Sequence, residues 1–262
     1  MSTSKKFTFV GCSITAGEGI PNELERWVNI VADHYQVTPL NLAVNGNSLN
    51  ETFMSAVHEI LFNCPDVLFV QWGTHNRVTL YPDTYLDHPL RIQVNSVPEQ
   101  ILERQQNLNA VKVFDNKQQA QTFIDQLILL NHEYYRLTEL LDYVNILQTM
   151  AKDKCSLVFT NGIARWTEEI QRLDTVTVWA NELSPYMKDI LDVDANTDDR
   201  LHQLGTALTN KFNQMDKTQW VNLFSTIHDM AIDRGTDNLH PGPRSNANYA
   251  DLVIQHLNSR SK

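Results

Sequence analysis

Cysteine is scarce in this chain of 262 residues, which contains only Cys12, Cys64 and Cys155. Cysteines so far apart, with no paired spacing, provide neither a disulfide framework nor a zinc-binding pattern, and they suit a reducing compartment. The chain also lacks any apolar run near the roughly 18 residues that a membrane span needs. The short apolar run after Lys5 and Lys6 is more typical of a buried strand than of a signal peptide. We therefore expect a cytoplasmic protein, while association with a virion or export by another route stays open.

Positive charge is also in short supply, because 21 Lys and Arg residues face 31 Asp and Glu residues, for a formal net charge of −10. An acidic chain without a basic run does not favour nucleic acid or an anionic membrane as a partner. The sequence contains no internal repeat, low-complexity tract or linker, and its length fits one large domain over 1–262. Nothing in the pattern indicates an oligomeric state.

Short apolar runs that alternate with helical patterns predict a parallel α/β sheet. In the first part of the chain the strands are expected at 6–12, 37–44 and 67–72. Helices are expected at about 22–35 and after Asn50, which we interpret as an N-cap. The run at 67–72 is apolar without alternation, as expected for a strand that is buried on both faces. This order of strands and helices is typical of a parallel sheet.

The stretch at 77–116 is less regular and contains Pro82, Pro89 and Pro98. It is predicted as an insertion near the active edge of the sheet, with strand-like pieces near 91–94 and 111–114. Beyond it, strands are expected at 155–162 and 175–180. The helical spacing of apolar residues predicts one long helix and three shorter ones, at about 117–151, 198–215, 217–233 and 246–258.

Two polar segments far apart in the chain carry the groups of a nucleophilic site. Ser13 follows the first expected strand directly, and ligands bind beyond the carboxyl ends of the strands in a parallel sheet. A serine hydroxyl needs a base in contact with it, and the base is commonly a histidine oriented by a carboxylate. Asp237 and His240 can supply both from one turn, and Pro241 biases His240 away from helical geometry. Alone, Ser13 would be an ordinary turn residue.

These residues resemble the motifs of the SGNH hydrolase family, also called GDSL-like esterases. In that family the nucleophilic Ser follows the first strand, a Gly follows the second, an Asn follows the third, and a D-x-x-H pair precedes the last helix. Here Gly11-Cys12-Ser13 is similar to the first block, with Cys12 where the family often has Asp, and Gly46 is similar to the second. Asp237 and His240 match the last block.

The third block departs from the family pattern of G-x-N. Without a gap, the Asn position falls on His75, and with a shift of one residue it falls on Asn76. Either side chain can donate a hydrogen bond to an oxyanion. The resemblance therefore implies an oxyanion hole made by backbone N–H groups of Ser13 and Gly46, completed by His75 or Asn76. Trp72, beside this loop, is a candidate for substrate contact.

The resemblance implies a three-layer α/β/α sandwich with a central parallel sheet, SGNH/flavodoxin-like, with an insertion after the third strand. It also implies a serine esterase acting on a short-chain acyl ester, such as an O-acetyl group on a carbohydrate, without a cofactor or metal. An acyltransferase and a non-catalytic binding module on the same fold stay open as alternatives. Cys12 as the nucleophile is a further alternative. A metal site is another, drawn from His228, Asp229, Asp233, Asp237 and His240, although no HExxH-type pair is present.

Overall fold

The computed structural model describes residues 5–73, 77–80, 90–93, 96–107, 113–130, 133–162, 197–223 and 225–260. Four strands form a parallel sheet in the order β2-β1-β3-β6, which corresponds to the start of the flavodoxin-like order. Their bounds are β1 Phe7–Val10, β2 Pro39–Asn41, β3 Val67–Trp72 and β6 Ser156–Asn161. The predicted parallel α/β sheet is confirmed. The strand predicted at 175–180 lies outside the described residues.

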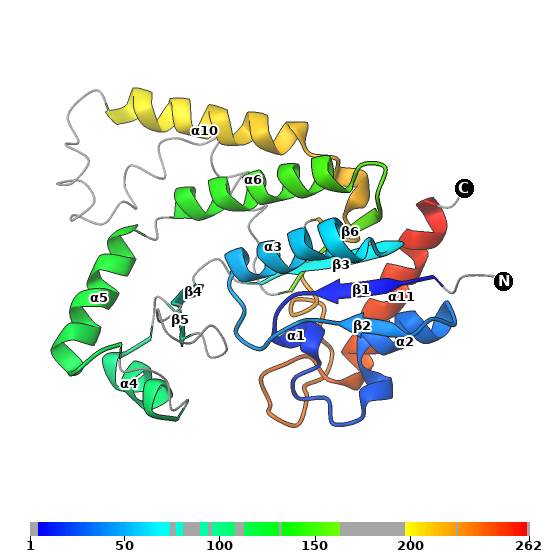
Figure 1. The fold of residues 1–262 in the computed structure, drawn as a ribbon, viewed down its shortest axis with the longest axis horizontal. Coiled ribbons are helices and arrows are strands. Elements are labelled where there is room, and N and C mark those ends of the chain that lie inside the picture. The colour runs from blue at the N-terminus through cyan, green and yellow to red at the C-terminus, as the bar shows by residue number, and fades with distance from the viewer. Residues whose placement is uncertain are drawn as a thin grey trace.

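Helices cover both faces of this sheet, as Figure 1 shows, with α3, α6 and α10 on one face and α2 and α11 on the other. The helices packed on the sheet are α2 Trp27–His34, α3 Leu49–His58, α6 Glu133–Ala151, α10 Thr197–Gln214 and α11 Pro243–Arg260. Shorter helical turns are α1 Ser13–Ala16, η1 Glu23–Glu25, the π-helix η2 Glu59–Asn63 and η3 Lys217–Gln219. None of the helices within the described ranges is both long and apolar enough to cross a membrane.

Each face of the sheet carries its own hydrophobic core. In β1 the side chains alternate, so that Phe7 and Phe9 pack toward α2 and α11 while Val10 packs toward α3 and α6. Phe9 and Phe69 stack on neighbouring strands with ring centroids 4.3 Å apart. Because both faces are covered, β3 reads as the nearly unbroken apolar run from which it was predicted.

A smaller packed unit follows β3. It contains the antiparallel pair β4 Arg77–Leu80 and β5 Leu90–Gln93 with helices α4 Pro98–Asn107 and α5 Lys117–Leu130. Its separate apolar cluster comprises Leu90, Ile92, Ile101, Phe114, Ala120 and Ile124. We call this unit the satellite. It continues past residue 116, the predicted end of the insertion, into α5.

One prediction within the satellite was wrong, and one of its strands, β4, was not predicted. The expected strand near 111–114 is not found at Val113 and Phe114, the described part of that range. Both of their backbone N–H groups donate to Oε1 of Gln105 on α4, at 2.7 and 2.9 Å. A side chain of the neighbouring helix therefore takes the hydrogen bonds that a strand partner would have taken.

Three helix predictions also need correction. The N-cap of α3 is Ser48 and not Asn50, because Ser48 and Glu51 form a capping box. The predicted helix at 22–35 is a short 3₁₀ turn followed by α2 from Trp27. The predicted helix at 117–151 is two helices, α5 and α6, whose axes point in different directions in Figure 1.

The predicted helix at 217–233 is the largest error. Only the 3₁₀ turn η3 forms at its start. The following backbone N–H groups donate to β6 and the residue after it, with Val221 bonded to the carbonyl of Phe159 at 3.1 Å and Ile227 to that of Asn161 at 3.2 Å. At Val221, Ile227 and His228 the segment therefore hydrogen-bonds to β6 and to Gly162 instead of to a preceding helical turn.

Candidate active site

Ser13 lies at the carboxyl end of β1, as predicted, and is the first residue of α1. The chain turns sharply there because Gly11 has no side chain: a Cβ at Gly11 would lie 2.5 Å from Oγ1 of Thr15. Oγ1 of Thr15 in turn donates to Gln71 on β3 at 2.6 Å. The turn is thus held between two central strands. The Ser13 side chain is nearly buried, with 5% of its surface exposed.

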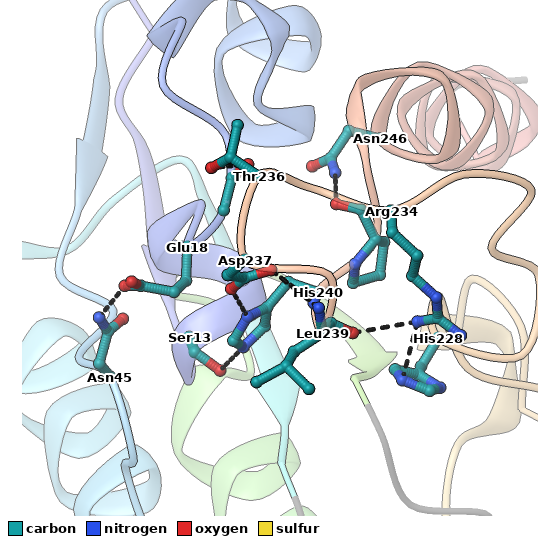
Figure 2. A network of polar contacts seen from close by, with 12 residues as sticks. Ser13, Glu18, Asn45, His228, Arg234, Thr236, Asp237, Leu239, His240 and Asn246 are labelled. Atoms are coloured by element: carbon teal, nitrogen blue, oxygen red, sulfur yellow. Dashed lines mark hydrogen bonds and ion pairs between the residues drawn. The ribbon is translucent and has the colours of Figure 1, made fainter.

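The structure brings Ser13, His240 and Asp237 into one hydrogen-bonded chain (Figure 2). Nε2 of His240 lies 2.9 Å from Oγ of Ser13. Nδ1 of His240 lies 2.5 Å from Oδ2 of Asp237. The three side chains are thus placed within the hydrogen-bond reach that a nucleophile, its base and an orienting carboxylate require.

The second oxygen of the Asp237 carboxylate accepts hydrogen bonds from the backbone. Oδ1 lies 3.0 Å from the backbone N of Leu239 and 3.0 Å from that of His240. The hydrogen bond from the His240 side chain, followed by that from Leu239, lowers the pKa of Asp237 to about 2. The carboxylate is therefore ionised at neutral pH and can only accept, so the proton of the neutral imidazole resides on Nδ1. Nε2 then faces Ser13 as an acceptor.

The loop that carries Asp237 and His240 is tied down at its far end by Asn246 of α11. The buried Asn246 amide donates to the carbonyls of Pro241 and Gly242, at 3.1 and 3.0 Å. Its oxygen accepts from the backbone N–H of Trp27, at the start of α2, at 3.1 Å. One side chain therefore fixes the end of the histidine loop to two helices of the same layer.

The near end of this loop is packed against the loop that follows α1. The backbone N–H of Thr236 donates to the carbonyl of Gly19 at 2.9 Å. A Cβ at Gly235 would lie 2.5 Å from that same oxygen, and a Cβ at Gly19 would lie 2.8 Å from Oδ1 of Asp237. Glycine at both positions allows the backbones to approach this closely, and this approach places Asp237 above Ser13.

Gly46 lies in the loop between β2 and α3, with a positive φ of 79° that favours glycine. The next residue, Asn47, is buried, and its amide donates to the carbonyl of Gly11 at 3.1 Å, which places the Gly46 loop beside Ser13. Among the residues that the structure describes, neither the backbone N–H of Ser13 nor that of Gly46 donates a hydrogen bond. Both N–H groups are therefore candidates to receive a ligand oxygen.

The remaining oxyanion candidates, His75 and Asn76, lie outside the described residues. Gly73, the last described residue before them, packs against Cys12, since a Cβ at Gly73 would lie 3.4 Å from Sγ of Cys12. The chain therefore leaves β3 directly beside the turn that carries Ser13. The competing nucleophile, Cys12, is fully buried.

Trp72 belongs to the hydrophobic core and is not an exposed contact surface. Only 1% of its surface is exposed, and its ring stacks on that of Phe159 with centroids 6.1 Å apart. This burial contradicts the prediction that Trp72 contacts substrate. Trp72 follows the pattern of β3, whose side chains are buried on both faces of the sheet.

The candidate metal ligands are occupied in other ways. Asp233 accepts from the backbone N–H groups of Arg244 and Ser245 at the start of α11, both at 2.9 Å. His228 contacts Arg234 through Nε2, at 3.1 Å from Nη1. Burial lowers the pKa of His228, and the Arg234 charge lowers it further. Among the residues the structure describes, no group of three or more His, Cys, Asp or Glu side chains could hold a metal ion.

Sequence reasoning missed the residues that support the site. Neither Asn47 nor Asn246 was singled out from the sequence, because Asn47 bonds to the distant Gly11 carbonyl and Asn246 joins its own loop to the distant backbone of Trp27. Ser48 and Glu51 did have a sequence signal, since Ser-x-x-Glu before an apolar run is a capping-box pattern.

No protein-family model and no curated protein sequence matches this chain. Solved structures are similar to it. They include TesA, at 9% identity and a TM-score of 0.45, over 97% of this chain and 98% of that one. The esterase EstA from Pseudoalteromonas sp. shares 12% identity at a TM-score of 0.45, over 97% of both chains. A catalytic mutant of Axe2, an acetylxylan esterase from Geobacillus stearothermophilus, shares 15% identity at a TM-score of 0.41, over 98% and 95%. At such identities and TM-scores, function must rest on the geometry of the site.

Proposed function

We propose that this chain is a serine hydrolase of the SGNH kind that cleaves a carboxylic ester, with Ser13 as nucleophile. The observation that carries the proposal is the hydrogen-bonded chain from Asp237 through His240 to Oγ of Ser13, with contacts of 2.5 and 2.9 Å. The order of these residues along the chain, with the serine after β1 and the Asp-x-x-His pair before α11, is also that of the family whose motifs the sequence resembles.

The proposed reaction begins when His240 takes the proton of the Ser13 hydroxyl through Nε2. Oγ of Ser13 then attacks the ester carbonyl, and Asp237 stabilises the imidazolium that forms. His240 returns the proton to the leaving alcohol, and an acyl group remains on Ser13. A water molecule, deprotonated by the same histidine, releases the acid and restores the hydroxyl.

The negative oxygen of the tetrahedral intermediate needs donors on the side of Ser13 away from His240. The backbone N–H groups of Ser13 and Gly46 are two proposed donors, and a side chain at His75 or Asn76 is the third. Loss of one such donor typically lowers kcat by about 10²–10³. A fold with the triad but a weak oxyanion hole would therefore still label slowly with a reactive inhibitor.

For the substrate we propose a short acyl ester, with an O-acetyl group on a carbohydrate as the specific case. The motif resemblance supports this class. A panel of p-nitrophenyl acetate, butyrate and octanoate, together with acetylated xylan, measures it directly. A preference for octanoate over acetate would contradict the short-chain proposal and leave the serine mechanism intact.

The mechanism is tested by labelling with a fluorophosphonate and by turnover of p-nitrophenyl acetate. Wild-type protein should be labelled and active, Ser13→Ala should lose both, and Ser259→Ala, an exposed serine on α11, should keep both. Absence of labelling and turnover in the wild type would overturn the proposal in favour of a binding module. Labelling with turnover only when a sugar acceptor is added would indicate an acyltransferase.

A further inference from the structure

Arg91 of β5 joins the satellite to the first turn of α3. Its Nη2 lies 2.8 Å from Oε1 of Glu51, and its Nε lies 3.1 Å from Oε2. Two parallel charge-assisted hydrogen bonds fix both the distance and the orientation of the partners. Figure 1 shows β4 and β5 beside the N-terminal end of α3, where this pair forms.

Glu51 is a buried meeting point of several groups, with 7% of its surface exposed. Besides Arg91, its Oε2 accepts from the backbone N–H of Ser48 at 3.1 Å and from Oγ1 of Thr79 on β4 at 2.6 Å. Burial alone would raise the pKa of Glu51, but the hydrogen bonds from Arg91 and Thr79 outweigh it and lower that pKa. Glu51 is therefore an anion, and Arg91 supplies a positive charge in direct contact with it.

The aliphatic part of the same arginine covers Gly46. A Cβ at Gly46 would lie 3.3 Å from Cδ of Arg91 and 3.9 Å from its Cβ. Gly46 is two residues before Ser48, whose backbone is held by Glu51. Arg91 thus contacts the loop at Gly46 and also holds the carboxylate that caps the end of that loop.

The opposite side of the loop is held by the turn that carries Ser13. Asn47 donates to the carbonyl of Gly11 at 3.1 Å, and the Asn45 amide donates to the Glu18 carboxylate. The backbone of Gly46 therefore lies between two supports, the Ser13 turn on one side and the Arg91 side chain on the other. Glycine has little conformational preference of its own, so its N–H direction depends on these supports.

We propose that Arg91 is a positioning residue that holds the Gly46 N–H group toward the oxyanion beside Ser13. It acts through its ion pair with Glu51 and through the packing of its stem on Gly46. This inference rests on the proposed hydrolase function. It also gives the satellite a role, since β5 supplies the residue that completes the geometry of a site on the main sheet.

The test compares Arg91→Ala and Arg91→Lys with Arg136→Ala, which removes an arginine of similar exposure whose ion pair with Glu139 lies within α6. Arg91→Ala should lower kcat by about 10²-fold with little change in KM, because a misplaced donor affects the transition state more than substrate binding. It should weaken inhibition by a trifluoromethyl ketone, whose adduct carries an oxyanion, by a similar factor. Arg91→Lys should restore part of the loss, and Arg136→Ala should change neither quantity.

Hydrogen exchange provides a readout that needs no activity. Backbone amides of residues 44–48 should exchange faster in Arg91→Ala than in the wild type or in Arg136→Ala. A merely structural role would lower the unfolding temperature while leaving kcat, inhibitor binding and this local exchange unchanged in the folded protein, and that result would overturn the inference. If the wild type and Arg91→Ala are both labelled at Ser13 and hydrolyse ester at the same rate, the proposed function stands and only the role of Arg91 is refuted. If the wild type is neither labelled nor active, the proposed function fails. In that case, equal hydrogen exchange of residues 44–48 in Arg91→Ala and in the wild type would refute the inference that Arg91 positions the Gly46 loop.

Discussion

Nε2 of His240 lies 2.9 Å from Oγ of Ser13 although 227 residues separate the two in the chain. The contact is produced by the close approach of two loops, the one after α1 and the one before α11. Gly19 and Gly235 allow that approach, and Asn246 holds the end of the histidine loop to α2. The separation is that of a hydrogen bond, which is the geometry that proton transfer from Ser13 to His240 requires.

Asp237→Asn should lower kcat for p-nitrophenyl acetate by about 10³–10⁴, because an amide can donate to Nδ1 and so favour the wrong tautomer of His240. The fold should be retained. Asp251→Asn, at an exposed carboxylate of α11, is the control and should match the wild type. Steady-state kinetics on both variants measure the difference. A loss smaller than tenfold in Asp237→Asn would contradict the proposed role of Asp237.

Asp237 should also make the stability of the fold depend on pH in the acid range. Its pKa is lowered from the ordinary 3.8 to about 2 in the folded chain. Since the unfolded chain binds this proton more readily, the ionised carboxylate stabilises the fold above about pH 3.8, and the contribution is lost as the pH falls toward 2. Urea denaturation of the wild type and Asp237→Asn at pH 5, 3.5 and 2.5 should show that their free energies of unfolding converge as the pH falls. A difference in unfolding free energy that stays constant across these pH values would contradict the proposed contribution of the Asp237 carboxylate.

Gly19→Ala should disturb Asp237 and also strain the backbone. Its φ is +76°, where an L side chain costs about 1–2 kcal/mol, and its Cβ would lie 2.8 Å from Oδ1 of Asp237. We expect lower stability and a loss of kcat. In an Asp237→Asn background the stability loss should persist while the further loss of kcat should be small, since the carboxylate is already absent. Fully additive losses of kcat would show that Gly19 acts elsewhere.

The Trp72→Phe substitution distinguishes between two roles for Trp72, packing in the core and contact with substrate. The side chain is 1% exposed and packs on Phe159, so the smaller ring should lower stability by less than the about 3–5 kcal/mol typical of a buried Trp→Ala change. KM for each ester should be unchanged. Chemical denaturation and substrate titrations measure the two effects. A change in KM at full stability would restore Trp72 as a candidate for substrate binding.

Alanine substitutions at His75 and Asn76 should reveal which residue completes the oxyanion hole. The donor should lose about 10²–10³ in kcat when replaced, while the other variant should stay within a few-fold of the wild type. Binding of a trifluoromethyl ketone should weaken in the same variant. If neither variant loses activity, the third donor does not come from the loop after β3.

Much of the fold could be predicted because the strands of a covered sheet leave a direct trace in sequence. β3 was predicted with its observed bounds, Val67–Trp72, since a strand buried on both faces has to be apolar throughout. Ser13 and His240 were predicted as partners from residue type and from their places beside the first strand and the last helix. The hydrogen bonds that join them have no sequence signal of their own.

The amino-acid sequence by itself determined the parallel α/β organisation and which side chains could act as nucleophile, base and orienting acid. The tertiary structure decided which groups accept the backbone hydrogen bonds and which distant side chains pack together. Apolar residues at helical spacing predicted a helix over 217–233, but β6 supplied to Val221 and Ile227 the acceptors that a helix would otherwise have provided. The contacts of Arg91 with Glu51 and Gly46 likewise have no signal in the sequence and form only when the chain folds. Local propensity contributes a few tenths to about one kcal/mol per residue, and contacts between distant segments routinely outweigh it.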